Sequence, residues 1–320
     1  MTVFNNTLYF SAYDLTNGVE LWKSDGTESG TQLVRDINTG STSSTPQYLT
    51  VFNNRLFFAA TTSSLGRELW SSDGTSSGTT LVKDIWAGSG NGANPKYLTV
   101  YNNMLYFSAY DNTRGAELWS SDGTSAGTNI VSNINPGTGA GSNPSEFAVF
   151  NNKLYFSATG SSTNGTELYT TDGTSVGTVL VKDISAGSAS SSPKFLTVFN
   201  NLLYFAANDG INGNELFTYD GTSVLLVKDI NPGSANSDPS RLTVFNDRLF
   251  FAANDGTNGQ CLWWSDGLAS GTLLLIETGV AGAGGFSLVK FDRSFTVFNN
   301  SMYITASGVN AIGDELWLLE

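Results

Sequence analysis

Short apolar runs separated by polar turns fill the chain, and none shows the three-to-four-residue apolar spacing of a helix. Four such runs make up one unit, and in one copy they are Tyr48–Phe52, Arg55–Ala60, Glu68–Ser72 and Thr80–Ile85. The runs are rich in Val, Leu, Thr, Tyr and Phe, and the β-branched and aromatic residues among them favour strands. The pattern therefore predicts an all-β protein made of four-stranded units.

The unit is repeated along the whole chain. The block Thr-Val-Phe-Asn-Asn, or a close variant, recurs every 46 to 53 residues, and its copies begin at Thr2, Thr50, Thr99, Ala148, Thr197, Thr243 and Thr296. A second block, Glu-Leu-Trp-x-Ser-Asp-Gly-Thr or a variant, follows each first block about 18 residues later. Such a period predicts one repeat domain over residues 1–320, with units 1–49, 50–98, 99–147, 148–196, 197–242, 243–295 and a partial unit 296–320.

Both hairpin turns of a unit carry residues suited to tight turns. Asn-Asn joins the first two strands in nearly every copy, and Asn tolerates the positive φ that a two-residue type I′ turn needs. Asp-Gly-Thr joins the last two strands, where an Asp side chain is suited to accept backbone N–H groups. These carboxylates are expected to be turn caps rather than catalytic or metal-binding groups: Asp25, Asp73, Asp122, Asp172, Asp220 and Asp266.

The first two strands of each unit are apolar at almost every position, whereas the fourth alternates with charge. Both faces of the first two strands must therefore be covered, and the fourth strand lies nearer to water. A sheet of this kind is the blade of a β-propeller. We expect a closed ring of seven blades, the last without its outer strand, and the alternative is six blades plus a C-terminal segment. A β-solenoid is disfavoured because its coils usually have shorter repeats.

Composition and charge exclude several classes of function. The net charge is −13 and the pI is about 4.3, which argues against nucleic acid as a partner. Histidine is absent, so Ser-His-Asp triads and His-ligated zinc are excluded. Cys261 is the single cysteine and cannot form an internal disulfide. No apolar run approaches the roughly 20 residues of a membrane-spanning helix, so membrane insertion is not expected.

The motif at 68–75, Glu-Leu-Trp-Ser-Ser-Asp-Gly-Thr, and its copies resemble the signature of bacterial ELWxxDGT-repeat proteins. The resemblance covers essentially the whole chain and implies a secreted or surface-exposed bacterial β-propeller, hence an extracellular or cell-surface location. No defined catalytic residues come with this family, so none are carried over. Two copies depart from the pattern: Cys261 replaces the Glu, and the turn at 219–226 has lost three residues.

Residues that every copy shares are expected to serve the blade itself, and Glu20, its equivalents and the aromatic residue two positions later are interpreted as structural. Recognition is instead expected at the variable loops between the second and third strands, which emerge on one face together with the crossings between blades. The candidate ligand-binding residues are Tyr13, Asp14, Asn17, Tyr110, Asp111, Arg114, Asn208, Asp209, Asn254 and Asp255, with Trp86 in a crossing. The alternative interpretation is that these polar side chains only close solvated turns and that Trp86 covers the blade rim.

Two further features of the sequence are candidate sites. Asp14, Asn17 and Glu20 have a spacing that calcium could use, but the dense acidic run of a dedicated calcium loop is missing, so no metal or cofactor is assigned. The crossing at 277–295 is the longest and lacks proline. We interpret it as a degenerate linker, with a lid or binding loop as the alternative.

Together these observations predict a non-enzymatic binding or scaffold propeller, a monomer that recognises a carbohydrate or protein through its variable loop face. Weak binding at several blades would gain strength through multivalency. One alternative is a polysaccharide-acting enzyme, a glycosidase or lyase that works through paired carboxylates. Another is a purely structural segment of a large surface protein, because the chain starts within a strand at Met1.

Overall fold

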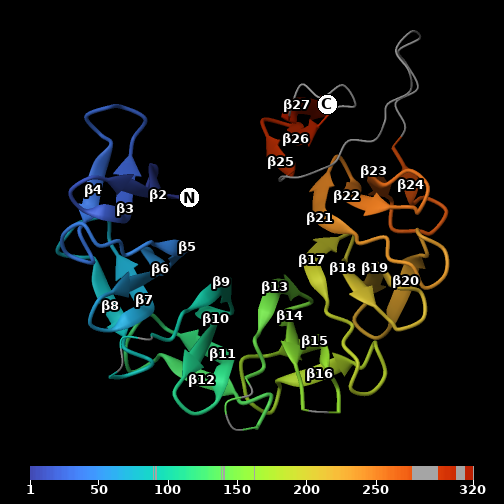
Figure 1. The fold of residues 1–320 in the computed structure, drawn as a ribbon, viewed down its shortest axis with the longest axis horizontal. Coiled ribbons are helices and arrows are strands. Elements are labelled where there is room, and N and C mark those ends of the chain that lie inside the picture. Colours follow the sequence, from blue (N-terminus) through green and yellow to red (C-terminus); the bar gives the residue numbers. More distant parts are fainter. Residues whose placement is uncertain are drawn as a thin grey trace.

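The computed structural model describes residues 1–88, 90, 92–137, 139, 141–161, 163–275, 295–307 and 314–319, and in these residues every regular element is a strand. The strands form seven antiparallel sheets, six with four strands and one with three. In Figure 1 the sheets follow one another around an arc, with the inner strands on its inside. This confirms a seven-bladed β-propeller whose last blade has three strands in the described residues. No helix in the described residues is long and apolar enough to cross a membrane.

Each blade runs in chain order from its inner strand to its outer strand. Blades 1 to 3 comprise β1 Thr2–Phe4, β2 Thr7–Asp14, β3 Gly18–Ser24 and β4 Gln32–Arg35; β5 Gln47–Phe52, β6 Arg55–Thr62, β7 Gly66–Ser72 and β8 Thr80–Lys83; and β9 Lys96–Tyr101, β10 Met104–Asp111, β11 Gly115–Ser121 and β12 Asn129–Ser132. Blades 4 to 6 comprise β13 Ser145–Phe150, β14 Lys153–Thr159, β15 Thr166–Thr171 and β16 Val179–Lys182; β17 Lys194–Phe199, β18 Leu202–Asn208, β19 Asn214–Tyr219 and β20 Val224–Lys228; and β21 Ser240–Phe245, β22 Arg248–Asn254, β23 Gln260–Ser265 and β24 Leu273–Leu274. Blade 7 comprises β25 Phe295–Phe298, β26 Ser301–Ser307 and β27 Asp314–Leu319.

The two kinds of hairpin turn have the geometry that their residues predict. Asn53 and Asn54 have φ of 45° and 54°, the positive values of a type I′ turn, and the pair that joins the first two strands of every other blade does the same. In the second kind of turn, Asp73 Oδ1 accepts the backbone N–H and the hydroxyl of Thr75 at 2.9 and 2.7 Å. These hydrogen bonds from Thr75 lower the pKa of Asp73. The prediction that the repeated aspartates are turn caps is confirmed.

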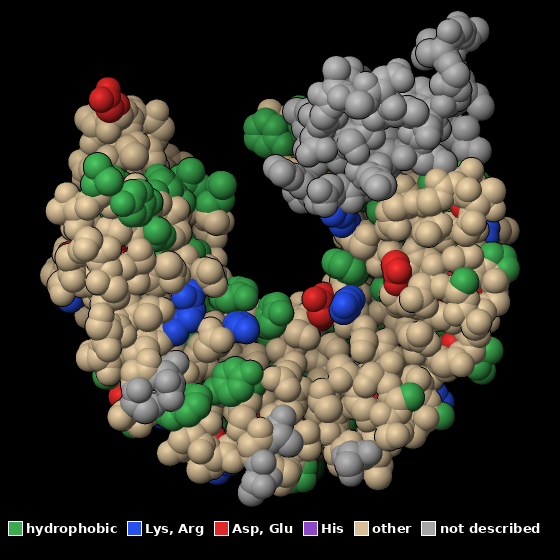
Figure 2. Space-filling model, in the orientation of Figure 1, with side chains coloured by type: hydrophobic (Ala, Val, Ile, Leu, Met, Phe, Trp, Pro, Cys, Tyr) green, Lys and Arg blue, Asp and Glu red, His purple; other side chains and the backbone are tan. Residues whose placement is uncertain are grey.

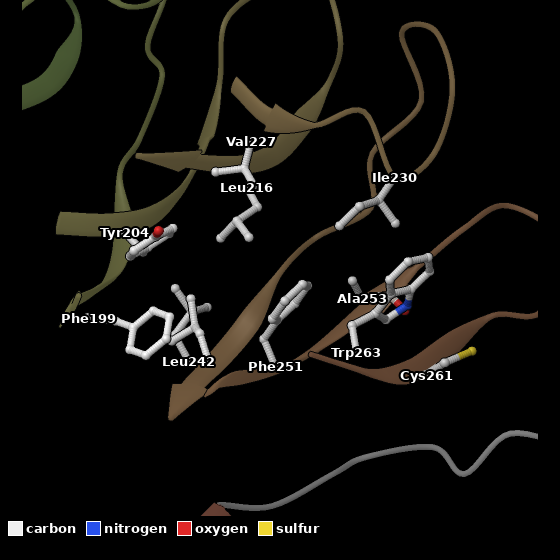
Figure 3. Close-up of a cluster of buried hydrophobic side chains, with 11 residues drawn as sticks. Phe199, Tyr204, Leu216, Val227, Ile230, Leu242, Phe251, Ala253, Cys261 and Trp263 are labelled. Atoms are coloured by element: carbon white, nitrogen blue, oxygen red, sulfur yellow. The ribbon is translucent and has the colours of Figure 1, made fainter. Parts of the chain in front are cut away.

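Six clusters of buried apolar side chains lie between consecutive blades and form the core. Figure 3 shows the cluster between blades 5 and 6, where Phe199, Tyr204 and Leu216 of blade 5 pack with Phe251 and Trp263 of blade 6. Tyr204 and Phe251 are fully buried. Each interior blade therefore packs one face on the preceding blade and the other on the following blade. That arrangement explains why the inner strands are apolar at almost every position.

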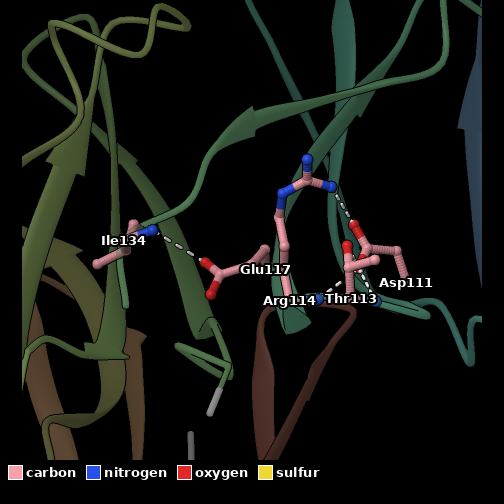
Figure 4. A network of polar contacts seen from close by, with 5 residues as sticks. All are labelled: Asp111, Thr113, Arg114, Glu117 and Ile134. Carbon is pink, nitrogen blue, oxygen red and sulfur yellow. Dashed lines mark hydrogen bonds and ion pairs between the residues drawn. The ribbon is translucent and has the colours of Figure 1, made fainter. Parts of the chain in front are cut away.

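Buried glutamates fasten the third strand of five blades to the crossing that leaves the blade. The carboxylate of Glu68 accepts backbone N–H groups from Ile85, Trp86 and Ala93 at 3.0, 3.3 and 2.8 Å. Glu20, Glu117, Glu167 and Glu215 are likewise fully buried and bond their own crossings, as Figure 4 shows for Glu117 and the N–H of Ile134. Burial raises the pKa of all five carboxyls. The expected structural role of this glutamate is confirmed.

Blade 6 carries Cys261 at the position of the glutamate. Its thiol is buried and donates to the backbone oxygen of Gly259 at 3.1 Å, so it bonds its own loop and not a crossing. Burial raises the pKa of this thiol to about 11, which keeps it neutral at physiological pH. The substitution therefore removes one fastening without placing a reactive thiolate there.

The blades form an open arc and not the closed ring expected from the sequence. Thr50 Oγ1 donates to Leu98 O at 3.2 Å and Lys83 Nζ donates to Thr128 O at 2.6 Å, so blades 2 and 3 are joined at both their inner and outer strands. Blades 1 and 7 stand apart at the two ends of the arc in Figure 1, and no apolar cluster of described residues joins them. Closure was predicted wrongly because each contact fixes only the angle between two neighbours, and six such contacts leave the ends separated.

Candidate functional site on the inner wall

The loop residues expected to bind a ligand mostly bind their own loops. Asp209 Oδ1 accepts the N–H groups of Ile211 and Asn212 at 2.9 and 2.8 Å, and its Oδ2 accepts the side-chain amide of Asn212 at 2.7 Å. Asp14 and Asp255 make the equivalent bonds in their loops. These carboxylates close Asx turns, which is the alternative role considered for them.

Asn208 and Asn254 also close their turns, by accepting the N–H groups of Gly210 and Gly256 at 2.7 and 2.8 Å. Asn17 donates its side-chain amide to Asp14 in the same kind of turn. A side chain whose donors and acceptors are used within its own loop has fewer of them left for a ligand.

The loop of blade 3 holds the one ion pair found among the described residues. Arg114 contacts Asp111 at 2.6 Å, and Asp111 also accepts hydrogen bonds from Thr113 (Figure 4). Burial acts to raise the pKa of Asp111, but the hydrogen bonds from Thr113 and Arg114 outweigh it and lower the pKa. Tyr110, also in this loop, has its hydroxyl 3.5 Å from Asn143 Oδ1.

The remaining candidates lie apart from one another. Tyr13 is 64% exposed, whereas Trp86 is half-buried against the apolar cluster between blades 2 and 3, where it covers the blade rim. The residues 277–294 of the proposed linker or lid lie outside the described residues, and Phe295 begins β25. The predicted residues are thus spread over separate loops, one set to a blade, and are not gathered into one site.

The spacing considered for calcium does not bring its three side chains together. Glu20 is fully buried and bonds its crossing, while Asp14 and Asn17 bond each other in the loop. In the described part of the chain, no group of three or more Asp, Glu, Cys or His side chains is placed to hold a metal ion.

A different site lies on the inner wall of the arc, where each of five inner strands carries a bulge. At each bulge a non-glycine residue adopts the left-handed conformation: Tyr48, Tyr97, Glu146, Phe195 and Arg241, with φ of 57° to 60°. The register of the inner strand shifts next to each of them. Such residues are strained, and strain of this kind is concentrated at functional sites. The backbone conformation repeats from blade to blade while the side chain changes.

Three of these variable residues border a cavity of about 260 Å³ between blades 4, 5, 6 and 7. Its lining includes Glu146, Phe195 and Arg241 with the apolar side chains Phe147, Leu242 and Phe295. Glu146 Oε2 accepts the backbone N–H of Phe195 at 2.7 Å, which fixes the carboxylate beside the ring. Figure 2 shows hydrophobic, acidic and basic side chains close together along the inside of the arc.

Aromatic rings extend this wall toward blade 2. The ring centroids of Tyr48 and Tyr97 are 5.6 Å apart, and those of Tyr97 and Phe147 are 6.4 Å apart. Phe195 and Tyr97 are 37% and 38% exposed, so their faces are available to a ligand. Within the described residues, the guanidinium of Arg241 makes no hydrogen bond or ion pair. The wall can therefore stack apolar groups and hold a carboxylate at Arg241.

Sequence reasoning missed this site because it looked for variation in loops. The signal is present in the sequence, two positions before the repeated Thr-Val-Phe block, where the copies change from Tyr to Glu to Phe to Arg. The bulge that turns this position toward the inside is set by backbone pairing across the blade, which the residue types alone do not reveal.

No protein-family model and no curated protein matches the chain. Solved structures with similar folds include a puromycin-hydrolyzing peptidase of Mycobacterium tuberculosis (TM-score 0.59, 10% identity, covering 100% of this chain and 51% of that one). Prolyl oligopeptidase B of Galerina marginata, bound to a 35mer substrate, has a TM-score of 0.55 at 12% identity over 99% of this chain and 47% of that one. A puromycin hydrolase has a TM-score of 0.55 at 11% identity over 99% of this chain and 51% of that one. This chain spans about half the length of each, and the likeness shows the fold.

These findings correct the function expected from the sequence. A non-enzymatic propeller that recognises a carbohydrate or protein through its loop face was expected, but the similar solved structures include a puromycin-hydrolyzing peptidase and a prolyl oligopeptidase. The physical reason for the wrong inference is visible in the loops, whose variable Asp and Asn side chains are engaged in closing their own turns. The loop sequences differ between copies because different side chains close the turn in each loop.

Proposed function

We propose that this propeller binds an extended peptide along its inner wall and presents it to a peptidase active site. The observation that carries the proposal is the set of strained, variable residues around one cavity, above all Glu146, Phe195 and Arg241. The backbone conformation at these positions repeats while the side chain changes, so the inner wall presents a different chemical group at each blade.

The chemistry of the wall suits a peptide. The exposed rings of Tyr97 and Phe195 offer apolar surface to a peptide's side chains, and Arg241 offers a guanidinium to a carboxylate. Glu146 adds an acceptor for an amine or a backbone N–H. A peptide combines apolar, acidic and basic groups at short intervals, as this wall does.

Hydrolysis of a peptide by a Ser-His-Asp triad needs a histidine, which these 320 residues do not contain. With no histidine, they cannot assemble a Ser-His-Asp triad, so hydrolysis of that kind requires another domain or chain. The similar solved structures are about twice as long as the part matched here, and one of them is bound to a 35mer hydrolysis and macrocyclization substrate. The role proposed for this chain is therefore to bind and orient the substrate.

Fluorescence anisotropy with a panel of labelled peptides, varied in charge and aromatic content, tests the proposal. We expect saturable binding that Phe195→Ala weakens by about tenfold, the effect of losing one aromatic contact. Tyr110→Ala on the loop face is the matched control and should leave binding unchanged. Thermal unfolding of each variant separates lost binding from lost fold.

Two results would overturn the proposal. One is the absence of saturable binding by every peptide of the panel. The other is binding that Tyr110→Ala reduces and Phe195→Ala does not, which would return recognition to the loop face.

A further inference from the structure

The interface between consecutive blades uses the same residues six times. In the first, Phe4, Tyr9 and Leu21 of blade 1 pack with Leu56 and Phe58 of blade 2. In blades 2 to 6, the residues at the positions of Phe4, Tyr9 and Leu21 pack in the same way. Their partners lie in the following blade, at the positions of Leu56 and Phe58. Each blade thus has a front face, on the side of the next blade, and a different rear face, on the side of the preceding one.

Among the residues that the structure describes, no blade packs on the rear face of blade 1. Leu56 and Phe58 on the rear face of blade 2 are fully buried, whereas Leu8 and Phe10 at the same positions of blade 1 are only half-buried. Met1, which aligns with inner-strand residues such as Leu98, is 90% exposed, while Leu98 is 8% exposed. An uncovered apolar face on a β-sheet is a binding surface or an aggregation liability.

The front face of blade 7 is uncovered in the complementary way. Phe298 is 61% exposed, whereas Phe4 at the same position of blade 1 is 4% exposed. Tyr303 is half-buried, whereas its equivalent Tyr204 is fully buried. One end of the arc therefore carries the front half of the repeated interface and the other end carries the rear half.

We infer that a second copy of this chain docks head to tail, with its blade 1 packed on blade 7 of the first copy. The six interfaces within the chain show what covers each of these faces, and a second copy offers the missing half at each end. The two faces differ, so the contact joins unlike surfaces and can be repeated from copy to copy. Because the two ends of one arc stand apart in Figure 1, the contact forms between molecules. The inference does not depend on the proposed function.

A hydrogen bond found between neighbouring blades of one chain can also form where blade 7 of one copy meets blade 1 of the next. Thr2 Oγ1 donates to Leu49 O of blade 2 at 2.8 Å, and Thr50 repeats this bond to Leu98 O of blade 3. Thr296 occupies the same position in blade 7 and is exposed. Its hydroxyl has the carbonyl group of Met1 of the second copy as the equivalent acceptor. The net charge of −13 opposes association of two copies, so added salt should strengthen it.

Sedimentation velocity over a range of protein and salt concentrations tests whether copies associate. We expect the mean mass to rise with both, and Phe298→Glu, which places a charge on the front face of blade 7, to weaken association by about tenfold or more. Val176→Glu is the matched control, because Val176 is 91% exposed in a turn of blade 4 and away from both ends. A mass that stays at one chain under all conditions would overturn the inference.

Cross-linking identifies the faces involved. In a Cys261→Ala background, Leu8→Cys and Phe298→Cys are prepared as separate variants, mixed, and treated with a short bismaleimide. Head-to-tail docking gives a cross-linked dimer in the mixture and little in either variant alone. When both cysteines are in one chain, docking gives a ladder of oligomers. If that double variant instead cross-links within single chains, the arc closes on itself and the inference is wrong.

Discussion

The outer part of the blades and their inner wall follow opposite rules. In the outer part, the same side chain keeps the same partner: Glu68 accepts the N–H of Ile85 at 3.0 Å, and Glu167 in blade 4 accepts the N–H of Ile184 at 2.9 Å. On the inner wall, the backbone repeats while the side chain changes, since Phe195 and Arg241 share φ values of 57° and 60°. A position where both the backbone conformation and the side chain repeat serves the fold. A position where a strained backbone repeats under changing side chains points to a ligand.

The largest expected effect on stability comes from comparing the same residue with and without a preceding blade packed against it. Phe58→Ala in blade 2 should lower the free energy of unfolding by about 3–5 kcal/mol, because it leaves a cavity between two blades. Phe10→Ala changes the same residue at the same position of blade 1, where the ring is only half-buried, and should cost about 1 kcal/mol. Urea unfolding at protein concentrations low enough to keep the chain monomeric measures both. Equal losses would mean that the rear face of blade 1 is covered within the monomer.

The buried glutamate gives the next largest effect. Glu68→Ala leaves three backbone N–H groups without their acceptor in a buried crossing and should lower the free energy of unfolding by about 3 kcal/mol. Glu28→Ala, at an exposed turn of blade 1, is the control and should change it by less than about 0.5 kcal/mol. The same urea experiment measures both, and a loss below about 1 kcal/mol for Glu68→Ala would show that water replaces the carboxylate.

The architecture could be predicted from the sequence because its rules are local. A two-residue Asn turn requires positive φ, and Asn53 and Asn54 have it. An Asp beside Gly-Thr caps its own turn, and Asp73 does so. Strands that are apolar on both faces need neighbours on both sides, and blades 2 to 6 have them. These features need only the residues within one repeat.

The inner wall and the open ends could not be predicted in this way. Glu146, Phe195 and Arg241 come from three different repeats, and only the arrangement of the blades places them around one cavity. Closure of the ring depends on the angle summed over six interfaces, which no single repeat encodes. The variable loops were easier to see in the sequence, but their polar residues satisfy one another locally.

A smaller effect concerns pH and the repeated carboxyls. Burial raises the pKa of Glu68 and Glu215 from the ordinary value of 4.5 to about 7. The native state therefore holds these protons to a higher pH than the unfolded chain does. The resulting stabilisation is complete below pH 4.5 and is lost as the pH rises through about 7.

The urea midpoint should accordingly fall between about pH 5 and about pH 8. Glu68→Gln, which cannot lose a proton, should make that fall shallower. The exposed turn cap Asp73 has a lowered pKa, so its contribution is lost at more acidic pH and does not affect this interval. A midpoint that rises between these pH values would contradict the prediction.

The smallest effect on stability falls on the inner wall and separates fold from function most directly. Phe195→Gly removes the ring but also the side chain that makes a φ of 57° costly, so the free energy of unfolding should stay the same or rise by up to about 1 kcal/mol. Thr197→Gly, two residues further along the same strand and at no positive φ, should lower it by about 1 kcal/mol. Peptide binding should fall about tenfold in Phe195→Gly, because that variant lacks the exposed ring. If Phe195→Gly instead loses stability as Thr197→Gly does, the ring contributes to packing, and the strained bulge is a feature of the blade with no bearing on a ligand.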